Sequence, residues 1–189
     1  MTGTYREAVV AVYVIDAGLS RFTVRGYAGG LLSGLGHNPV IAIRDFAGEA
    51  QWDPLKPDYA ALRLRIRAAG LSIENDINDK DRREMERVMR EEVLETDRFP
   101  EIVFESISAS AVPGGRIHVE GNLTLHGMTR RERISTQVAV TSDILRAFGN
   151  FAIMQTNYCI TLAAVAGGVL KLKDELKFNF DIVARRRTE

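Results

Sequence analysis

Leu62-Arg63-Leu64-Arg65-Ile66-Arg67 decides the fold class of this chain. Its two leucines and its isoleucine take every second position, and arginines fill the positions between them. Successive side chains of a β-strand point to opposite faces, so this segment has one apolar face and one charged face. That pattern is typical of an antiparallel sheet that buries one face and leaves the other in water.

The same alternation recurs in residues 21–27, 116–125, 131–140 and 176–182. Residues with turn chemistry separate the segments, among them Asp53-Pro54, Pro113-Gly114-Gly115 and Gly167-Gly168. Their spacing predicts about eight strands, roughly the number that closes into a barrel with a fillable interior. Ile41 and Ile43 share one parity while Phe46 and Trp52 share the other, so we expect a bulge or tight bend near Arg44-Asp45.

One segment, residues 78–94, follows a helical period instead. Its apolar residues fall at three- and four-residue spacing, and opposite charges recur at i,i+4. Asn78 or Asp79 can serve as the N-cap. We therefore predict a single amphipathic helix that closes one end of the barrel, with a lid over a pocket as the alternative. The residues concerned are Met85, Val88, Met89 and Val93, with the pairs Arg82–Glu86, Glu86–Arg90 and Arg87–Glu91.

The bulk properties favour one globular domain over residues 1–189. The chain has 189 residues, with 25 Lys plus Arg against 25 Asp plus Glu, so electrostatic attraction to nucleic acid is not expected. The apolar stretch 8–15 is too short to span a membrane and reads as a strand, so we expect no integral membrane segment and a cytoplasmic protein. Cys159 is the only cysteine, and we expect a small buried hydrophobic side chain there.

Several catalytic signatures are absent from the sequence. Residues 30–34 lack the first glycine of a nucleophile elbow, residues 34–36 lack the third glycine of a dinucleotide fingerprint, and there is neither a P-loop nor a His-Glu-x-x-His helix. His118 takes the polar parity of its strand and His126 reaches a turn at Gly127, so we assign both a structural or indifferent role. We predict no catalytic residue and no metal ligand.

His37 leaves two alternatives open because it lies in the glycine-rich loop 29–39. One is a metal- or haem-binding protein or an enzyme centred on His37, with Cys159 as a second participant, although no further ligand is readable at a suitable spacing. The other is a stress-response interaction module without any ligand. His37 capping its own loop is the simplest interpretation.

Four motifs in order resemble the YceI-like family. Tyr13-Val14-Ile15-Asp16 followed by residues 20–24 is similar to its opening pattern, and residues 97–106 are similar to its central "D-x-x-x-P-x-I-x-F-x-S". Gly121-Asn122-Leu123-Thr124-Leu125-His126-Gly127-Met128-Thr129-Arg130 resembles "G-x-L-T-L-H-G-V-T-R", its most specific signature. Residues 173–184 resemble the closing strand, so the likeness covers about 13–184.

This resemblance implies an all-β fold, a single lipocalin-like antiparallel barrel with one helix. It also implies non-enzymatic, lipid-binding activity: no cofactor, but a polyisoprenoid, an isoprenoid quinone or a fatty acid inside the barrel, for transport, storage or sequestration. A homodimer is a further implication, and an exposed edge strand would allow one. Many members are periplasmic, whereas no signal peptide is visible here.

We hypothesise that the inward parity of several strands lines a tunnel, although an ordinary solid core would show the same alternation. A polar head would stay at the mouth near His37 or Asn38. The predicted lining consists of Phe22, Val24, Leu64, Ile66, Phe104, Leu123, Leu125, Val138, Phe178 and Phe180.

Overall fold

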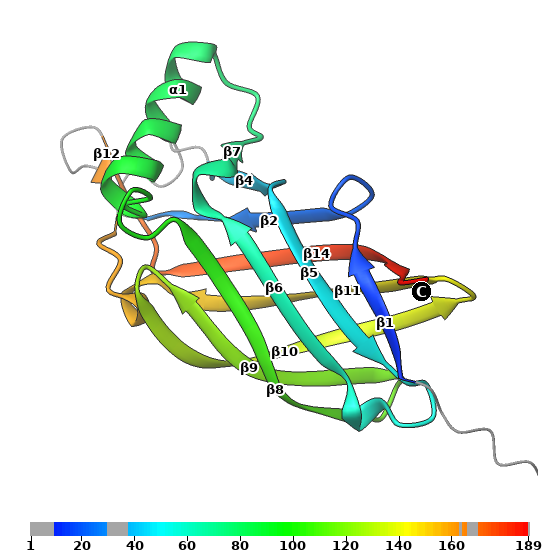
Figure 1. Cartoon of the computed structure of the whole chain (residues 1–189). Helices are drawn as coiled ribbons and strands as arrows, with labels where there is room; N and C mark the ends of the chain where they lie inside the picture. Colours follow the sequence, from blue (N-terminus) through cyan, green and yellow to red (C-terminus); the bar gives the residue numbers. More distant parts are fainter. Residues whose placement is uncertain (1–9, 30–37, 163, 166–169, 189) are drawn as a thin grey trace, which may run out of the picture.

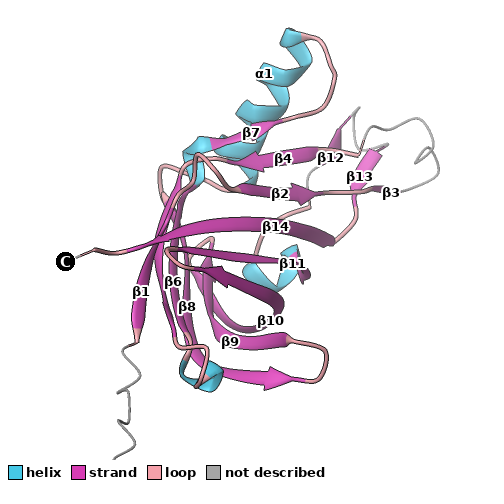
Figure 2. Cartoon of the chain, turned by 90° about the vertical axis from the view of Figure 1, so that its right-hand side faces the viewer, coloured by secondary structure: helices cyan, strands magenta, loops and turns pink. Residues whose placement is uncertain are grey.

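The computed structural model describes residues 10–29, 38–162, 164–165 and 170–188, and shows a β-barrel with one α-helix at its end (Figures 1 and 2). The strands are β1 (Ala11–Ile15), β2 (Arg21–Arg25), β3 (Ala28–Gly29), β4 (Val40–Ile43), β5 (Phe46–Trp52), β6 (Ala61–Arg67), β7 (Leu71–Ile73), β8 (Glu101–Val112), β9 (Arg116–Leu125), β10 (Met128–Thr141), β11 (Ile144–Met154), β12 (Ala164–Val165), β13 (Leu170–Leu172) and β14 (Glu175–Arg186). The helical elements are η1 (Pro57–Tyr59), η2 (Ala68–Gly70), α1 (Asp79–Val88), η3 (Met89–Val93) and η4 (Gln155–Tyr158).

Eight strands form the closed ring. They pair antiparallel in the order β1-β5-β6-β8-β9-β10-β11-β14, and β14 pairs again with β1, with Ile15 opposite Ala184. The predicted fold class, a single antiparallel barrel with one helix, is thereby confirmed. The alternating segments lie in β2, β6, β9, β10 and β14 as predicted. The turn expected at Gly167-Gly168 lies outside the described residues.

Strands β2, β4 and β7 extend the sheet from β14, and short breaks in the chain separate them from the ring strands β1, β5 and β6. β2 pairs with β14, β4 with β2 and β7 with β4. The break between β4 and β5 falls at Arg44-Asp45, where the change of parity predicted a bend. The break between β6 and β7 lies beside it, because the Arg67 amide donates to the Asp45 carbonyl at 2.9 Å. Adjacent breaks bend neighbouring strands together, which turns the sheet at a corner.

Helix α1 stands at this end of the barrel, next to β7 (Figures 1 and 2). Asn78 is the N-cap and accepts a hydrogen bond from the Asp81 amide at 3.0 Å, as one of the two predicted caps. The Ile73 amide donates to Glu86 Oε1 at 3.0 Å, and Arg82 donates to the Ile73 and Asn75 carbonyls. Helix side chains thus occupy polar groups on the free edge of β7, which hinders pairing with a second copy along that edge.

The predicted Arg82–Glu86 ion pair is wrong for the same reason. Both side chains bind backbone groups of Ile73 in β7: Glu86 accepts from its amide and Arg82 donates to its carbonyl, so the two side chains do not pair with each other. Of the other two predicted pairs, Arg87–Glu91 forms at 2.9 Å, and Arg90 lies 3.9 Å from Glu86.

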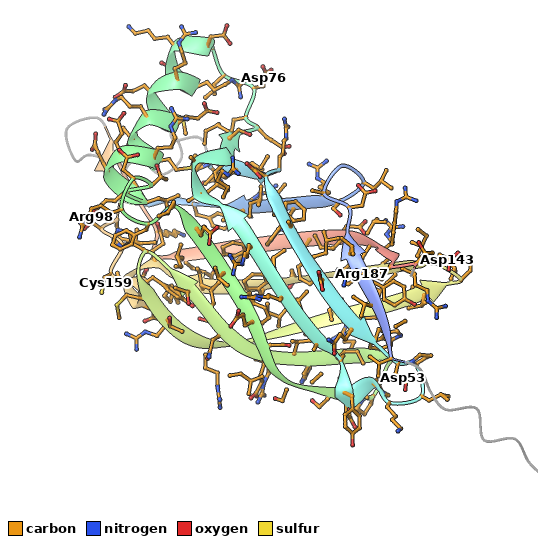
Figure 3. The ribbon with its side chains drawn as sticks, viewed as in Figure 1. Asp53, Asp76, Arg98, Asp143, Cys159 and Arg187 are labelled. Carbon is orange, nitrogen blue, oxygen red and sulfur yellow. The ribbon has the colours of Figure 1, made fainter. Side chains whose placement is uncertain are left out.

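The expectation that the Cys159 side chain is buried is wrong, because the structure leaves it exposed. It ends η4 with a left-handed backbone (φ 56°), a conformation that turns the chain at a helix C-terminus. The turn buries its neighbours Tyr158 and Ile160 and leaves the thiol outside. Figure 3 places Cys159 at the rim of the molecule, at the same end as Arg98.

The buried side chains form three clusters. The first surrounds Phe104 and Tyr158, the second surrounds Phe22 and Phe46, and the third joins Tyr13 to Leu145 and Ala184 where β1 meets β14. Between them the barrel is hollow.

Candidate ligand-binding site

A cavity of about 880 Å³ lies inside the barrel. Its wall is almost entirely aliphatic and aromatic, because it is made of the inward parity of the strands that face one another across the ring. The volume falls within the range of sites that hold small organic ligands. An apolar chain that enters such a space leaves water at a gain of about 0.8 kcal/mol per methylene.

Nine of the ten predicted lining residues border this cavity: Phe22, Val24, Leu64, Ile66, Phe104, Leu123, Leu125, Phe178 and Phe180. Val138 does not. It has the inward parity but packs against the clusters of Phe104 and Tyr13, where the interior is filled. The contact of these residues with a ligand stays a prediction.

Sequence reasoning missed a second group of lining residues. β11 contributes Leu145, Phe151 and Ile153, and the helix contributes Met85 and Met89. Helical spacing predicts that the methionines lie on the apolar face of a helix, but it does not indicate that this face borders a cavity. β11 escaped notice because apolar side chains also fill outward positions, Ile144, Phe148 and Met154, so no clean alternation is visible.

Aromatic rings form part of the wall. Phe151 of β11 and Phe178 of β14 are opposite each other in the register and stack with 4.5 Å between centroids. Phe22 contacts Phe178 and Phe180 at tilted or edge geometries. Such rings pack densely against one another, which gives this part of the wall a defined shape.

The cavity meets solvent at α1. Among its described lining residues only Asp81, Glu84 and Glu92 are exposed, and all three belong to α1 or η3. Arg87 is the one cation of that lining, and it bonds to Glu84 at 2.8 Å, to Glu91 at 2.9 Å and to Glu92 at 3.1 Å. The hydrogen bond from Arg87 lowers the pKa of Glu84, so this carboxylate stays ionised at neutral pH. The rim formed by these residues is therefore acidic.

Two polar side chains lie on the buried part of the wall, Thr136 and Gln155. The Thr136 hydroxyl is 3.2 Å from the Gln137 carbonyl and 3.3 Å from the Phe148 carbonyl. Gln155 donates through Nε2 to the carbonyls of Lys173 and Asp174. Neither residue was predicted, because one threonine and one glutamine carry no periodic signal.

Of the two predicted headgroup residues, His37 lies outside the described residues, so its relation to the cavity stays a prediction. Asn38 is exposed, is absent from the lining, and accepts a hydrogen bond from Asn75 through its carbonyl.

Neither His126 nor His118 borders the described cavity. His126 sits in the β9–β10 turn (φ 50°) with Nδ1 3.2 Å from the Tyr158 carbonyl and Nε2 3.5 Å from Glu95. Its ring contacts Phe99 at 4.5 Å, so it joins the turn to η4 and to the segment after η3. His118 is half-buried on β9. Within the described part of the chain, no three His, Cys, Asp or Glu side chains gather as metal ligands would.

The helices of the described segments are short, and none has the length and hydropathy needed to cross a bilayer.

Comparisons with known proteins agree with this architecture. A family model described as the YceI-like domain matches residues 13–184. A UPF0312 protein from Shewanella sp. (strain W3-18-1) is 29% identical over 97 residues, which is 51% of this chain and 48% of that protein. One from Pseudomonas putida is 25% identical over 125 residues, 66% of this chain and 60% of that protein. The chain therefore spans about half the length of the first curated relatives it matches.

Solved structures share the fold at low identity. Burkholderia cenocepacia BcnA superposes with a TM-score of 0.73 at 18% identity, covering 90% of this chain and 99% of that one. A polyisoprenoid binding domain from Saccharophagus degradans, implicated in plant cell wall breakdown, superposes with a TM-score of 0.62 at 12% identity, covering 94% and 99%.

Proposed function

The chain belongs to the YceI-like family, and we propose that its barrel binds one long apolar or amphipathic molecule, of the polyisoprenoid, isoprenoid quinone or fatty-acyl type. The observation that carries the proposal is the hollow interior. Protein interiors are normally close-packed, whereas here about 880 Å³ bordered by apolar groups stays open inside the barrel.

The shape of the cavity supports a chain-like ligand. Its lining runs from α1 to Leu145 and Ala184, near the opposite end of the barrel. An elongated hydrocarbon uses such a space along its whole length, so affinity grows with each added methylene until the far end is reached. The ordering of a flexible chain offsets part of this gain.

The solved polyisoprenoid binding domain supports the same ligand class by its fold. Binding, not catalysis, is the activity we propose, and the role is transport, storage or sequestration in the cytoplasm. Cell fractionation with an antibody to the chain tests the location.

The test of function is to identify what the native protein carries. The protein is purified without detergent from cells that naturally contain it, extracted with organic solvent, and the extract is compared by mass spectrometry with a mock purification. A polyisoprenoid, quinone or acyl species at about one per chain supports the proposal. An empty extract, together with failure of the emptied protein to bind any prenyl or acyl probe, contradicts it.

A further inference from the structure

The side chain of Gln155 is the first feature of the cavity that indicates the chemistry of the ligand's headgroup. It is 3% exposed and borders the cavity at the start of η4. Nε2 donates to the Lys173 carbonyl at 3.0 Å and lies 3.4 Å from the Asp174 carbonyl. Carbonyl oxygens only accept hydrogen bonds, so the nitrogen must face them, and the orientation of the amide is decided. No described residue donates to Oε1.

Oε1 therefore remains available to accept a hydrogen bond from a molecule in the cavity that this residue borders. A ligand that brings a hydroxyl, amide or ammonium donor to Gln155 would satisfy Oε1. An ether, an ester or an ionised phosphate brings only acceptors and would leave it unsatisfied. The side chain therefore discriminates by hydrogen-bond polarity.

The strand register places Gln155 at the mouth end of the barrel. It follows Met154, which pairs with Glu175 at the first position of β14. On the same end β9 finishes at Leu125, and β8 begins seven residues after Leu94. Since α1 and η3 lead directly into β8, the helix and Gln155 belong to the same end.

The acidic rim is the second sign, and it is independent of Gln155. Asp81, Glu84 and Glu92 carry three negative charges where the cavity meets solvent. Arg87, the one cation of the described lining, already bonds to Glu84, Glu91 and Glu92. An anionic headgroup would meet like charges and would have to displace a carboxylate from Arg87.

We propose that the ligand ends in an uncharged or cationic headgroup with a hydrogen-bond donor, such as an alcohol, an amide or an amine, and that Gln155 Oε1 accepts from it. Carboxylates and phosphates are selected against. This inference rests on the proposed binding of a long apolar chain and narrows its ligand classes, because oxidised quinones and ionised fatty acids carry no hydrogen-bond donor.

The test compares three probes that share one prenyl chain: geranylgeraniol, its methyl ether and geranylgeranyl monophosphate. Each displaces the same fluorescent apolar probe from delipidated full-length protein at low salt. We expect the alcohol to bind about three- to tenfold more tightly than the ether, the effect of one neutral hydrogen bond. We expect the monophosphate to bind more weakly than the alcohol.

Variants assign the effects to residues. Gln155→Met removes the acceptor, and the affinity ratio of alcohol to ether should fall to about one. Thr136→Val is the matched control: it removes the other polar side chain of the buried wall, and the ratio should persist. The double change Glu84→Gln with Glu92→Gln should raise the affinity for the monophosphate relative to that for the alcohol.

The outcomes separate the two proposals. If none of the probes displaces the reporter, the proposed binding function fails. If all bind but the ether equals the alcohol, or the monophosphate binds most tightly, binding stands and the headgroup assignment is overturned. The wild-type ratios decide this even if Gln155→Met does not fold.

Discussion

Leu64→Trp is expected to shorten the chain that the barrel accepts. Leu64 lies in the middle of β6, borders the cavity and packs against both the Phe104 and the Phe22 clusters. Beyond it, away from α1, the cavity continues between the small side chains of Ala50 and Ala184. An indole at position 64 would occupy the passage to that deep section.

The magnitude follows from the hydrocarbon excluded. Loss of about four methylenes from the deep section, at about 0.8 kcal/mol each, costs about 3 kcal/mol of binding free energy. That corresponds to roughly a hundredfold weaker Kd. Because the ring enters space that is already empty, the free energy of unfolding should change by less than the 1–3 kcal/mol typical of overpacking a filled core, about 1 kcal/mol or less.

The assay is displacement of a fluorescent probe by a series of saturated alcohols of increasing length. Wild-type affinity should rise with length, whereas that of Leu64→Trp should stop rising several carbons earlier and match the wild type for short chains. Arg65→Trp is the matched control, because the neighbouring side chain is exposed and points away from the cavity. A folded Leu64→Trp protein that binds the longest alcohol with wild-type affinity would refute a ligand in this cavity.

Three further predictions concern the scaffold. A Cβ on Gly121 would lie 2.4 Å from Phe104 Cζ. Gly121→Ala should therefore lower the free energy of unfolding by about 1–3 kcal/mol in urea titrations. An unchanged midpoint and slope would show that the Phe104 ring moves aside without cost. Cys159 is exposed, so a thiol reagent should label the native protein within about an order of magnitude of the unfolded rate, and strong protection would contradict this placement. Hydrogen bonds from the Thr156 hydroxyl and amide lower the pKa of Asp174 below its ordinary 3.8, so this stabilisation is complete above that value and is lost as pH falls through the folded pKa. Thr156→Val should raise the pKa of Asp174 in an NMR titration, and an unmoved titration midpoint would count against the contact.

The barrel was predictable because period-two alternation reports burial on one face, and Leu62 to Arg67 shows it without interruption. Alternation does not report whether the buried face meets another side chain or empty space. Val138 and Leu64 have the same inward parity, yet only Leu64 borders the cavity. The hollow depends on side-chain volumes from strands far apart in sequence, which no local pattern records.

Single polar residues were the least predictable part of the site. Nothing in the sequence distinguishes Gln155 from other turn residues. Its side chain is held in the interior by hydrogen bonds to the carbonyls of Lys173 and Asp174, which lie 18 and 19 residues away in the chain. For Cys159 the error was the reverse: the side chain was expected to be buried and is exposed. The statistical preference of a lone cysteine for the interior gave way to the left-handed turn that ends η4.

The pairing of β14 has a consequence for biosynthesis. This strand forms hydrogen bonds with β11, β2 and β1, so the ring cannot close until a segment that follows the other described strands has left the ribosome. Until then β1 and β11 each present an unpaired edge, and the apolar wall between them faces water. The nascent chain is thus most prone to aggregate after β11 has emerged and before β14 is available to pair with it.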